Sequence, residues 1–245
     1  MRNTRKLQTR EKQGLIVGAI AGLAVVVAVV AIVISSGGTT EGSGIDFTGD
    51  PGSDDVNIEM GRTDDGGHII GDPDAPVTIV AFEDFLCPHC QDYKPTVNRI
   101  LNDLVMTGRA KFEFRFLQTQ GANAVYAFQL AECAGELEEG GFWVAHDQLF
   151  AVASERGRSL TQDDLRSSVT DAVDISAAEI IECTRDADQY ETDQRYASRN
   201  NISRTPSLRL RYEDGGPLQV INNVETGGPS YEVIEATVDL AAAGQ

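Results

Sequence analysis

Residues 77–90 read VTIVAFEDFLCPHC. The apolar run that follows Pro76 predicts a buried strand. Two cysteines come directly after it, with two residues between them, and apolar residues then recur at helical spacing to about Val105. The cysteine pair therefore stands where a strand passes into a helix.

A second strand is predicted at Lys111–Phe116, where apolar and polar residues alternate strictly. Strand, helix and strand in this order form a βαβ unit, which predicts parallel pairing of the two strands. Beyond it the pattern is helical from Ala122 to about Arg199. Two short strands, Ser207–Arg211 and 218–222, and a last helix from Ser230 complete the chain.

Three interpretations of Cys87 and Cys90 compete. A zinc site needs a second ligand pair, and the other two cysteines are 50 residues apart. An inert bridge over two residues closes a very small loop and stabilises little. Because a CxxC at a strand-to-helix junction of a βαβ unit is typical of redox proteins, we favour a redox pair, with no metal and no cofactor.

The predicted position of the motif suits thiol chemistry. Cys87 would lie at a helix N-terminus, where unpaired N–H groups and the helix dipole favour a thiolate. Pro88 costs no hydrogen bond in the first turn, and His89 adds positive charge when it is protonated. Cys90 lies one turn on and should be more buried. A stable thiolate stabilises the reduced form, so the disulfide should be a strong oxidant.

The net charge of the chain limits the kinds of molecule that it can bind. The 245 residues carry a net charge of −18, and an acidic surface repels phosphate backbones, so nucleic acid is excluded as a partner. Four cysteines are too few for a disulfide scaffold, but they allow two pairs in an oxidising compartment. We expect Cys133 and Cys183 to form a structural disulfide, the alternative being two buried free thiols.

The N-terminal third predicts a membrane anchor. Residues 14–35 contain a run of 21 uncharged residues, about 30 Å as a helix, enough to cross a bilayer. The basic residues of segment 1–13 precede it, so the N-terminus should stay in the cytoplasm and the rest lie outside. A cleaved signal peptide is the alternative, but its apolar region is usually shorter. Residues 36–66, rich in Gly, Ser, Thr and Asp, predict a flexible linker.

Residues 84–90, with Pro95 beyond them, resemble the thioredoxin superfamily. More narrowly they resemble the DsbA-like thiol–disulfide oxidoreductases, in which a CPHC site is typical. The likeness extends over about residues 67–243. It includes Gly71–Val77, Cys133-Ala134, Gly141-Phe142-Trp143, His146-Asp147 and Thr205-Pro206.

The resemblance implies an α/β thioredoxin fold with an inserted helical domain at about 121–199. It implies that Cys87, Pro88, His89 and Cys90 form the catalytic motif. It also implies that Thr205 and Pro206 form a cis-proline loop that packs beside the disulfide and offers backbone to a substrate peptide.

One position departs from the family pattern. Members often carry a buried acid six residues before the first cysteine, where this chain has Ala81. Glu83 and Asp84 are expected to alternate faces at the strand end, so neither is expected to replace that acid. Of the other candidates, His68 is expected in a solvated loop, and His146 is expected to be packed on a helix.

The function expected from the motif and the resemblance is an extracytoplasmic, membrane-tethered thiol oxidase acting on reduced, folding exported proteins. A membrane reoxidase of the DsbB or vitamin K epoxide reductase type would restore the disulfide. The alternatives are a reductase or isomerase with the same residues, and a non-catalytic, chaperone-like binding module.

Overall fold

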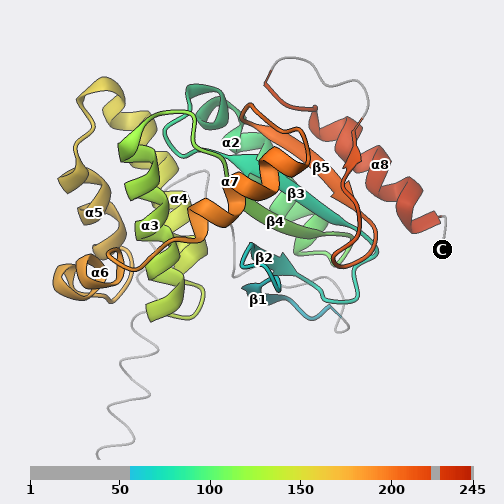
Figure 1. Ribbon diagram of the computed structural model, residues 1–245. Coiled ribbons are helices and arrows are strands. Elements are labelled where there is room, and N and C mark those ends of the chain that lie inside the picture. Colours follow the sequence, from blue (N-terminus) through green and yellow to red (C-terminus); the bar gives the residue numbers. More distant parts are fainter. Residues whose placement is uncertain (1–55, 222–226, 244–245) are drawn as a thin grey trace, which may run out of the picture. The chain divides into compact units, whose positions relative to one another are not determined.

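The computed structural model describes residues 56–221 and 227–243 (Figure 1). The predicted cytoplasmic segment, the anchor at 14–35 and most of the predicted linker lie outside the described residues. Within residues 56–221 and 227–243, no helix combines the length and apolar character needed to cross a membrane.

A six-stranded sheet forms the centre of the described domain, in the order β1-β2-β4-β3-β5-β6. The predicted pair β3 and β4 is parallel, as the βαβ interpretation requires, and the other pairs are antiparallel. The strands are β1 (Glu59–Arg62), β2 (His68–Gly71), β3 (Thr78–Glu83), β4 (Lys111–Phe116), β5 (Ser207–Arg211) and β6 (Gln219–Val220).

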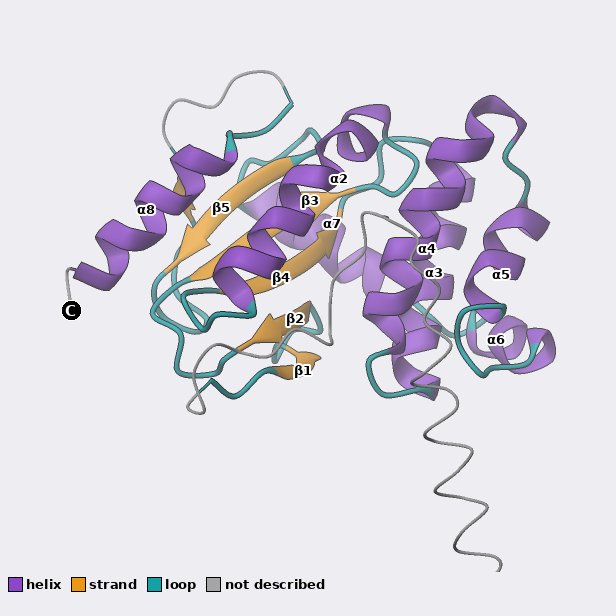
Figure 2. Ribbon diagram, turned by 180° about the vertical axis from the view of Figure 1, so that it is seen from behind, coloured by secondary structure: helices purple, strands orange, loops and turns teal. Residues whose placement is uncertain are grey.

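Helices cover both faces of the sheet (Figures 1 and 2). On one face lie α2 (Pro88–Ile100), which continues as a π-helical turn at Leu101–Val105, and α8 (Tyr231–Ala243). On the other face lies α7 (Gln189–Arg199). The inserted helices stand beside the sheet and comprise α3 (Ala122–Leu137), α4 (Gly141–Arg156), a short 3-10 turn (Gly157–Ser159), α5 (Gln162–Thr170) and α6 (Ala177–Cys183). The thioredoxin fold with a helical insertion is therefore confirmed.

The alternation of side chains along the strands separates two layers of core. Ile79 and Ala81 of β3 join the large core that includes α2 and the inserted helices, whereas Val80 and Phe82 join a small cluster with Ala197 of α7. The strict alternation in β4 gives the first layer three phenylalanines and leaves Lys111, Glu113 and Arg115 for the other face.

The charges on that second face are buried in pairs. The Arg115 guanidinium contacts carboxylates of Glu113 at 2.6 Å and Asp193 at 3.0 Å, and Arg211 bonds the other oxygen of Glu113. A buried charge without a partner costs roughly several kcal/mol of folding free energy. Because moving α7 or β5 away from β4 would separate these pairs, the contacts hold both elements against β4.

Two expectations about the start of the domain are wrong. Strand β1 lies inside segment 36–66, which was predicted to be linker, and pairs with β2. His68 is not in a solvated loop: it belongs to β2, is 4% exposed and stacks on Phe142. Arg62 of β1 contacts the ring nitrogen of His68 at 3.2 Å and the Glu136 carboxylate at 3.2 Å, which ties the hairpin to α3.

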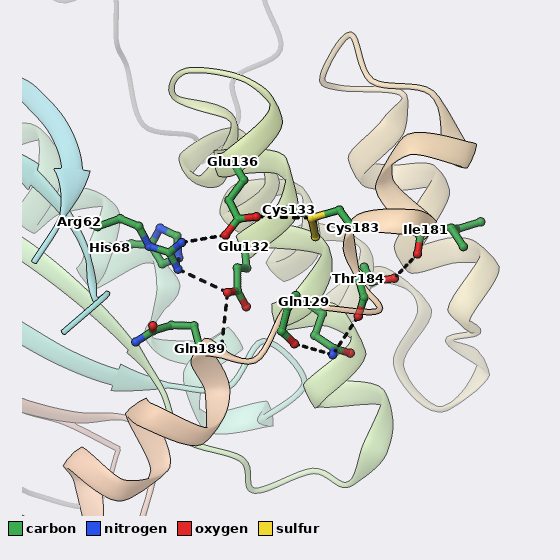
Figure 3. Close-up of a disulfide and its surroundings, with 11 residues drawn as sticks. Arg62, His68, Gln129, Glu132, Cys133, Glu136, Ile181, Cys183, Thr184 and Gln189 are labelled. Carbon is green, nitrogen blue, oxygen red and sulfur yellow. Dashed lines mark hydrogen bonds and ion pairs between the residues drawn. A yellow bond between two sulfur atoms is a disulfide. The ribbon is translucent and has the colours of Figure 1, made fainter. Parts of the chain in front are cut away.

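Two of the inserted helices, α5 and α6, begin at side-chain caps. Thr161 with Asp164 and Ser176 with Glu179 form reciprocal capping boxes at the starts of α5 and α6. Cys133 of α3 and Cys183 of α6 are joined by a disulfide, as expected (Figure 3). Cys133 is fully buried, whereas the Cys183 sulfur lies 3.6 Å from the Glu136 carboxylate near the surface.

Removal of this disulfide is expected to cost about 2–4 kcal/mol of unfolding free energy, because the bridge restricts a long loop of the unfolded chain. The measurement is urea unfolding of the Cys133→Ala, Cys183→Ala double variant against wild type, both with the active-site pair oxidised. Thiol exchange by the folded variant serves as the control and should persist. An unchanged unfolding midpoint would contradict the structural role.

Candidate active site

The two cysteines of the motif occupy the first turn of α2. Cys87 is the N-cap residue, Pro88 follows in the first turn, and no side-chain oxygen caps the helix. The Cys87 carbonyl accepts hydrogen bonds from the N–H groups of Cys90 and Gln91, both at 3.0 Å. Both cysteines are free thiols; Cys87 is 4% exposed, whereas Cys90 is fully buried.

The loop before β5 lies against the first sulfur. The Thr205–Pro206 peptide bond is cis, and the Cys87 sulfur lies 3.7 Å from the Thr205 carbonyl oxygen. Both geometrical expectations for this loop, the cis bond and its proximity to Cys87, are confirmed. Backbone more than one hundred residues away in sequence therefore forms one wall of the site.

The two sulfurs differ sharply in acidity. Hydrogen bonding from the Cys90 thiol, with further bonds from Thr205 and from the N–H groups of Cys90 and His89, outweighs burial and lowers the pKa of Cys87 to about 5. Burial, reinforced by the hydrogen bond to Cys87 and by the charge of Glu83, raises the pKa of Cys90 far above its ordinary value. At neutral pH the site therefore holds one thiolate and one thiol.

His89 contributes to this arrangement through its backbone. Its N–H group is among the donors that lower the pKa of Cys87, while its side chain is exposed. The predicted contribution of the protonated imidazole is not among the principal causes of the shift and stays a prediction.

Asp84 holds the surrounding loops in place. Its carboxylate accepts hydrogen bonds from the N–H groups of Leu86 at 2.9 Å, Thr119 at 2.7 Å and Gln120 at 2.9 Å. The Thr119 hydroxyl bonds the same carboxylate and lies 3.2 Å from the Thr205 hydroxyl. One buried side chain thus connects the motif, the end of β4 and the cis-proline loop.

Glu83, which was not an obvious replacement for the missing acid, is buried on the same side of β3 as Ala81. Residues 81 and 83 have the same parity in β3, so the carboxyl shares the α2-facing side of the sheet with Ala81. Glu83 is fully buried, and neither of its oxygens has a hydrogen-bond partner within the described residues. Burial raises its pKa to about 8, against the charge of Lys94, and its own charge raises the pKa of Cys90.

No metal is indicated at the site: within the described ranges, no three His, Cys, Asp or Glu side chains are grouped to hold an ion. The arrangement can instead perform sulfur exchange. A thiolate at a helix N-terminus, a fully buried partner thiol one helical turn away and a buried acid coupled to that thiol are parts that suit such exchange.

Thiolate absorbance of the reduced protein is expected to fall as the pH drops through about 5. In Cys90→Ala the midpoint should move to higher pH, because the strongest donor to the thiolate is lost. Cys90→Ser is the matched control, since its hydroxyl keeps a donor, and its midpoint should lie closer to wild type. Identical midpoints for Cys90→Ala and wild type would refute the assigned cause.

Comparison with known proteins agrees with this geometry. The sequence matches the family described as Thioredoxin over residues 63–214. It is 26% identical over 185 residues to disulfide bond formation protein D of Bacillus subtilis, covering 74% of this chain and 79% of that protein. A segment of 93 residues is 36% identical to the Na(+)/H(+) antiporter NhaA 1 of Salinispora arenicola, covering 37% of this chain and only 14% of the antiporter.

Solved structures share the fold. Oxidised BdbD from Bacillus subtilis superposes with a TM-score of 0.58 at 22% identity, covering 76% of this chain and 99% of that one. Wolbachia pipientis alpha-DsbA1 superposes with a TM-score of 0.61 at 16% identity, covering 73% and 92%. The chain therefore belongs to the thioredoxin family, and within that superfamily it is a DsbA-like protein thiol–disulfide oxidoreductase.

Proposed function

We propose that this protein is an extracytoplasmic thiol oxidase that donates its Cys87–Cys90 disulfide to exported proteins as they fold. The observation that carries the proposal is the position of Cys87 at the uncapped N-terminus of α2, beside the Thr205 loop, where hydrogen bonds from Cys90 and Thr205 lower its pKa to about 5. A stabilised thiolate favours the reduced form of the pair, so the disulfide accepts electrons readily.

The exchange proceeds in two displacements. A substrate thiolate attacks the Cys87 sulfur, the Cys87–Cys90 bond breaks, and Cys90 leaves as a thiolate that takes up a proton. A second substrate thiolate then attacks the substrate sulfur of the mixed disulfide, and Cys87 leaves as a thiolate. Two electrons pass from the substrate to the pair, and the low pKa makes Cys87 a good leaving group in the second step.

The wall formed by Thr205 and Pro206 is the proposed substrate-binding loop. The Thr205 carbonyl faces the reactive sulfur, and the hydroxyl contact with Thr119 connects this loop to the Asp84 network. A peptide bound along this backbone would present its own sulfur at Cys87 without a sequence-specific pocket, which suits a donor that acts on many unfolded chains.

The relatives support the oxidising direction and the location. The Bacillus subtilis relative is named a disulfide bond formation protein, and on that analogy the catalytic domain acts outside the cytoplasm. We propose that the segment at 14–35 anchors the protein to the lipid bilayer. A membrane reoxidase of the DsbB or vitamin K epoxide reductase type would accept the electrons.

A reductase or isomerase would use the same two cysteines at a more reducing potential. A chaperone-like module would bind unfolded chains without using the two cysteines. Activity that survives replacement of both cysteines would identify the module, and the reduction potential of the pair separates the other two functions.

Cys87→Ala is expected to abolish oxidation of a reduced, unfolded substrate, because no sulfur remains for the first attack. Cys90→Ala should accumulate mixed disulfides with a substrate that already contains a disulfide, because its Cys87 thiolate attacks that bond and no Cys90 thiol remains to release the substrate. The measurements are oxidation of reduced ribonuclease for Cys87→Ala, and non-reducing gels of Cys90→Ala mixed with disulfide-containing ribonuclease to detect the adducts. Wild-type oxidation by Cys87→Ala would refute the proposed chemistry.

His89→Ser tests whether the imidazole tunes the pair. Loss of its positive charge should raise the pKa of Cys87 and make the disulfide a weaker oxidant. A rise of one unit corresponds to about 1.4 kcal/mol, or about 30 mV for this two-electron couple. A glutathione equilibrium gives the potential, and thiolate absorbance gives the pKa. If the pKa rises while the potential stays constant, the assumed linkage fails for this protein.

A further inference from the structure

A short chain of hydroxyl groups connects the buried Asp84 carboxylate with the reactive sulfur. The Thr119 hydroxyl donates to Asp84 Oδ2 at 2.9 Å, and its oxygen lies 3.2 Å from the hydroxyl oxygen of Thr205. The Thr205 side chain in turn makes a hydrogen bond that helps to lower the pKa of Cys87. Two threonine hydroxyls thus stand between two acceptors, a carboxylate at one end and a sulfur at the other.

Asp84 holds the single hydroxyl hydrogen of Thr119. The Asp84 side chain is fully buried, and its carboxylate also accepts three backbone N–H groups, those of Leu86, Thr119 and Gln120. These bonds favour the ionised form, although burial and the charge of Cys87 raise the pKa of Asp84. An ionised carboxylate can only accept, and its bonds are stronger than those of a neutral oxygen, so the hydrogen of Thr119 points to Asp84.

Thr205 therefore has one hydroxyl hydrogen and two possible acceptors for it. Because Thr119 has given its hydrogen to the carboxylate, only Thr205 can donate across the contact of 3.2 Å between the two hydroxyl oxygens. The Cys87 thiolate is the other acceptor. When the hydrogen points to the sulfur, the two hydroxyl oxygens face each other with no hydrogen between them, so one bond is gained at the expense of the other.

The titratable and charged neighbours of Cys87 do not take part in this competition. Burial raises the pKa of Cys90, which stays a thiol and is itself a donor to the Cys87 sulfur. The Glu83 carboxyl of β3 has no hydrogen-bond partner among the described residues. The side chains of His89 in α2 and of Arg204, which precedes Thr205, are exposed.

We propose that Thr119, fixed by its carboxylate partner, is a positioning residue that competes with Cys87 for the hydroxyl hydrogen of Thr205. The hydrogen points to Thr119 while the cysteine pair is a disulfide, because the sulfur is then uncharged. It turns to Cys87 when exchange releases this sulfur as a thiolate, and the bond between the hydroxyls is lost. The competition limits how far the thiolate is stabilised, and hence how strongly the disulfide oxidises. The proposal rests on the thiol–disulfide exchange described above.

Removal of the competing hydroxyl should strengthen the bond to the sulfur. In Thr119→Val the pKa of Cys87 should fall by roughly 0.5 to 1 unit, the equivalent of one hydrogen bond of ordinary net strength. Thr119→Ser is the matched control, since it keeps the hydroxyl and should keep the wild-type pKa. Thr205→Val should raise the pKa, because the donor itself is lost. Thiolate absorbance of the reduced, full-length protein gives each midpoint.

The double variant separates this role from a structural disturbance of the loop. Without the Thr205 hydroxyl there is no hydrogen to compete for, so Thr119→Val should leave the pKa of Cys87 unchanged in the Thr205→Val background. The glutathione equilibrium at pH 7 should follow the pKa. Thr119→Val should favour the reduced pair by about three- to tenfold over wild type, and it should have no effect in the Thr205→Val background.

Unfolding in urea gives an independent measurement, because the bond between the two hydroxyls is expected in one redox state only. A double-mutant cycle of Thr119→Val and Thr205→Val should show a favourable coupling when the cysteine pair is oxidised. The coupling should be lost or reversed in sign when the pair is reduced, at a glutathione ratio that leaves the Cys133–Cys183 bridge intact.

The proposal fails if Thr119→Val leaves the pKa of Cys87 unchanged, raises it, or lowers it equally in the Thr205→Val background. Equal coupling in the two redox states would also overturn it. Failure of the wild type to oxidise reduced ribonuclease would instead overturn the proposed oxidase function. The midpoints and the couplings would still decide the role of Thr119, because neither measurement uses a protein substrate.

Discussion

The first turn of a helix exposes backbone N–H groups that have no carbonyl partner, and in α2 this protein places a sulfur at that position rather than a hydroxyl or a carboxylate. The uncapped donors stabilise a thiolate, so the same feature that would weaken an ordinary helix creates the reactive group. Much of the surrounding structure serves to keep this turn in place. Strand β3 delivers it, and the cis-proline loop closes over it from the other end of the chain.

Asp84 and Glu83 are neighbours with opposite functions. Asp84 satisfies its carboxylate with several hydrogen bonds and thereby fixes three loops, whereas Glu83 has no hydrogen bond within the described residues and therefore responds to nearby charge. Alternation along the strand separates them, since one side chain faces the loops and the other faces the core below the motif. A rigid support and a titratable group are thus obtained from two consecutive residues.

The sequence predicted those elements of the fold that short-range residue patterns determine. The period of two in β3 and β4, the helical spacing in α2 and the capping boxes of α5 and α6 all express short-range preferences, so they could be read from the chain. Strands β1 and β2 could not, because each has only four residues and they owe their stability to pairing with each other, to pairing of β2 with β4 and to the contact of Arg62 with α3. His68 was misjudged for the same reason, since its burial depends on Phe142 from a distant helix. The parity of Glu83 with Ala81 was available in the sequence. Its charge coupling to Lys94 depends on how α2 packs on β3 and could not be predicted from the sequence.

The Cys133–Cys183 bridge poses a problem of self-recognition, because a protein that carries a reactive thiolate also carries a second disulfide that could exchange with it. One sulfur of that bridge is sealed in the core, and the more accessible one lies next to the Glu136 carboxylate. Exchange at this bridge would have to begin at Cys183, because Cys133 is sealed in the core. The Glu136 carboxylate beside Cys183 is paired with Arg62, so burial of one sulfur, more than charge at the other, keeps the two disulfides of one molecule chemically separate.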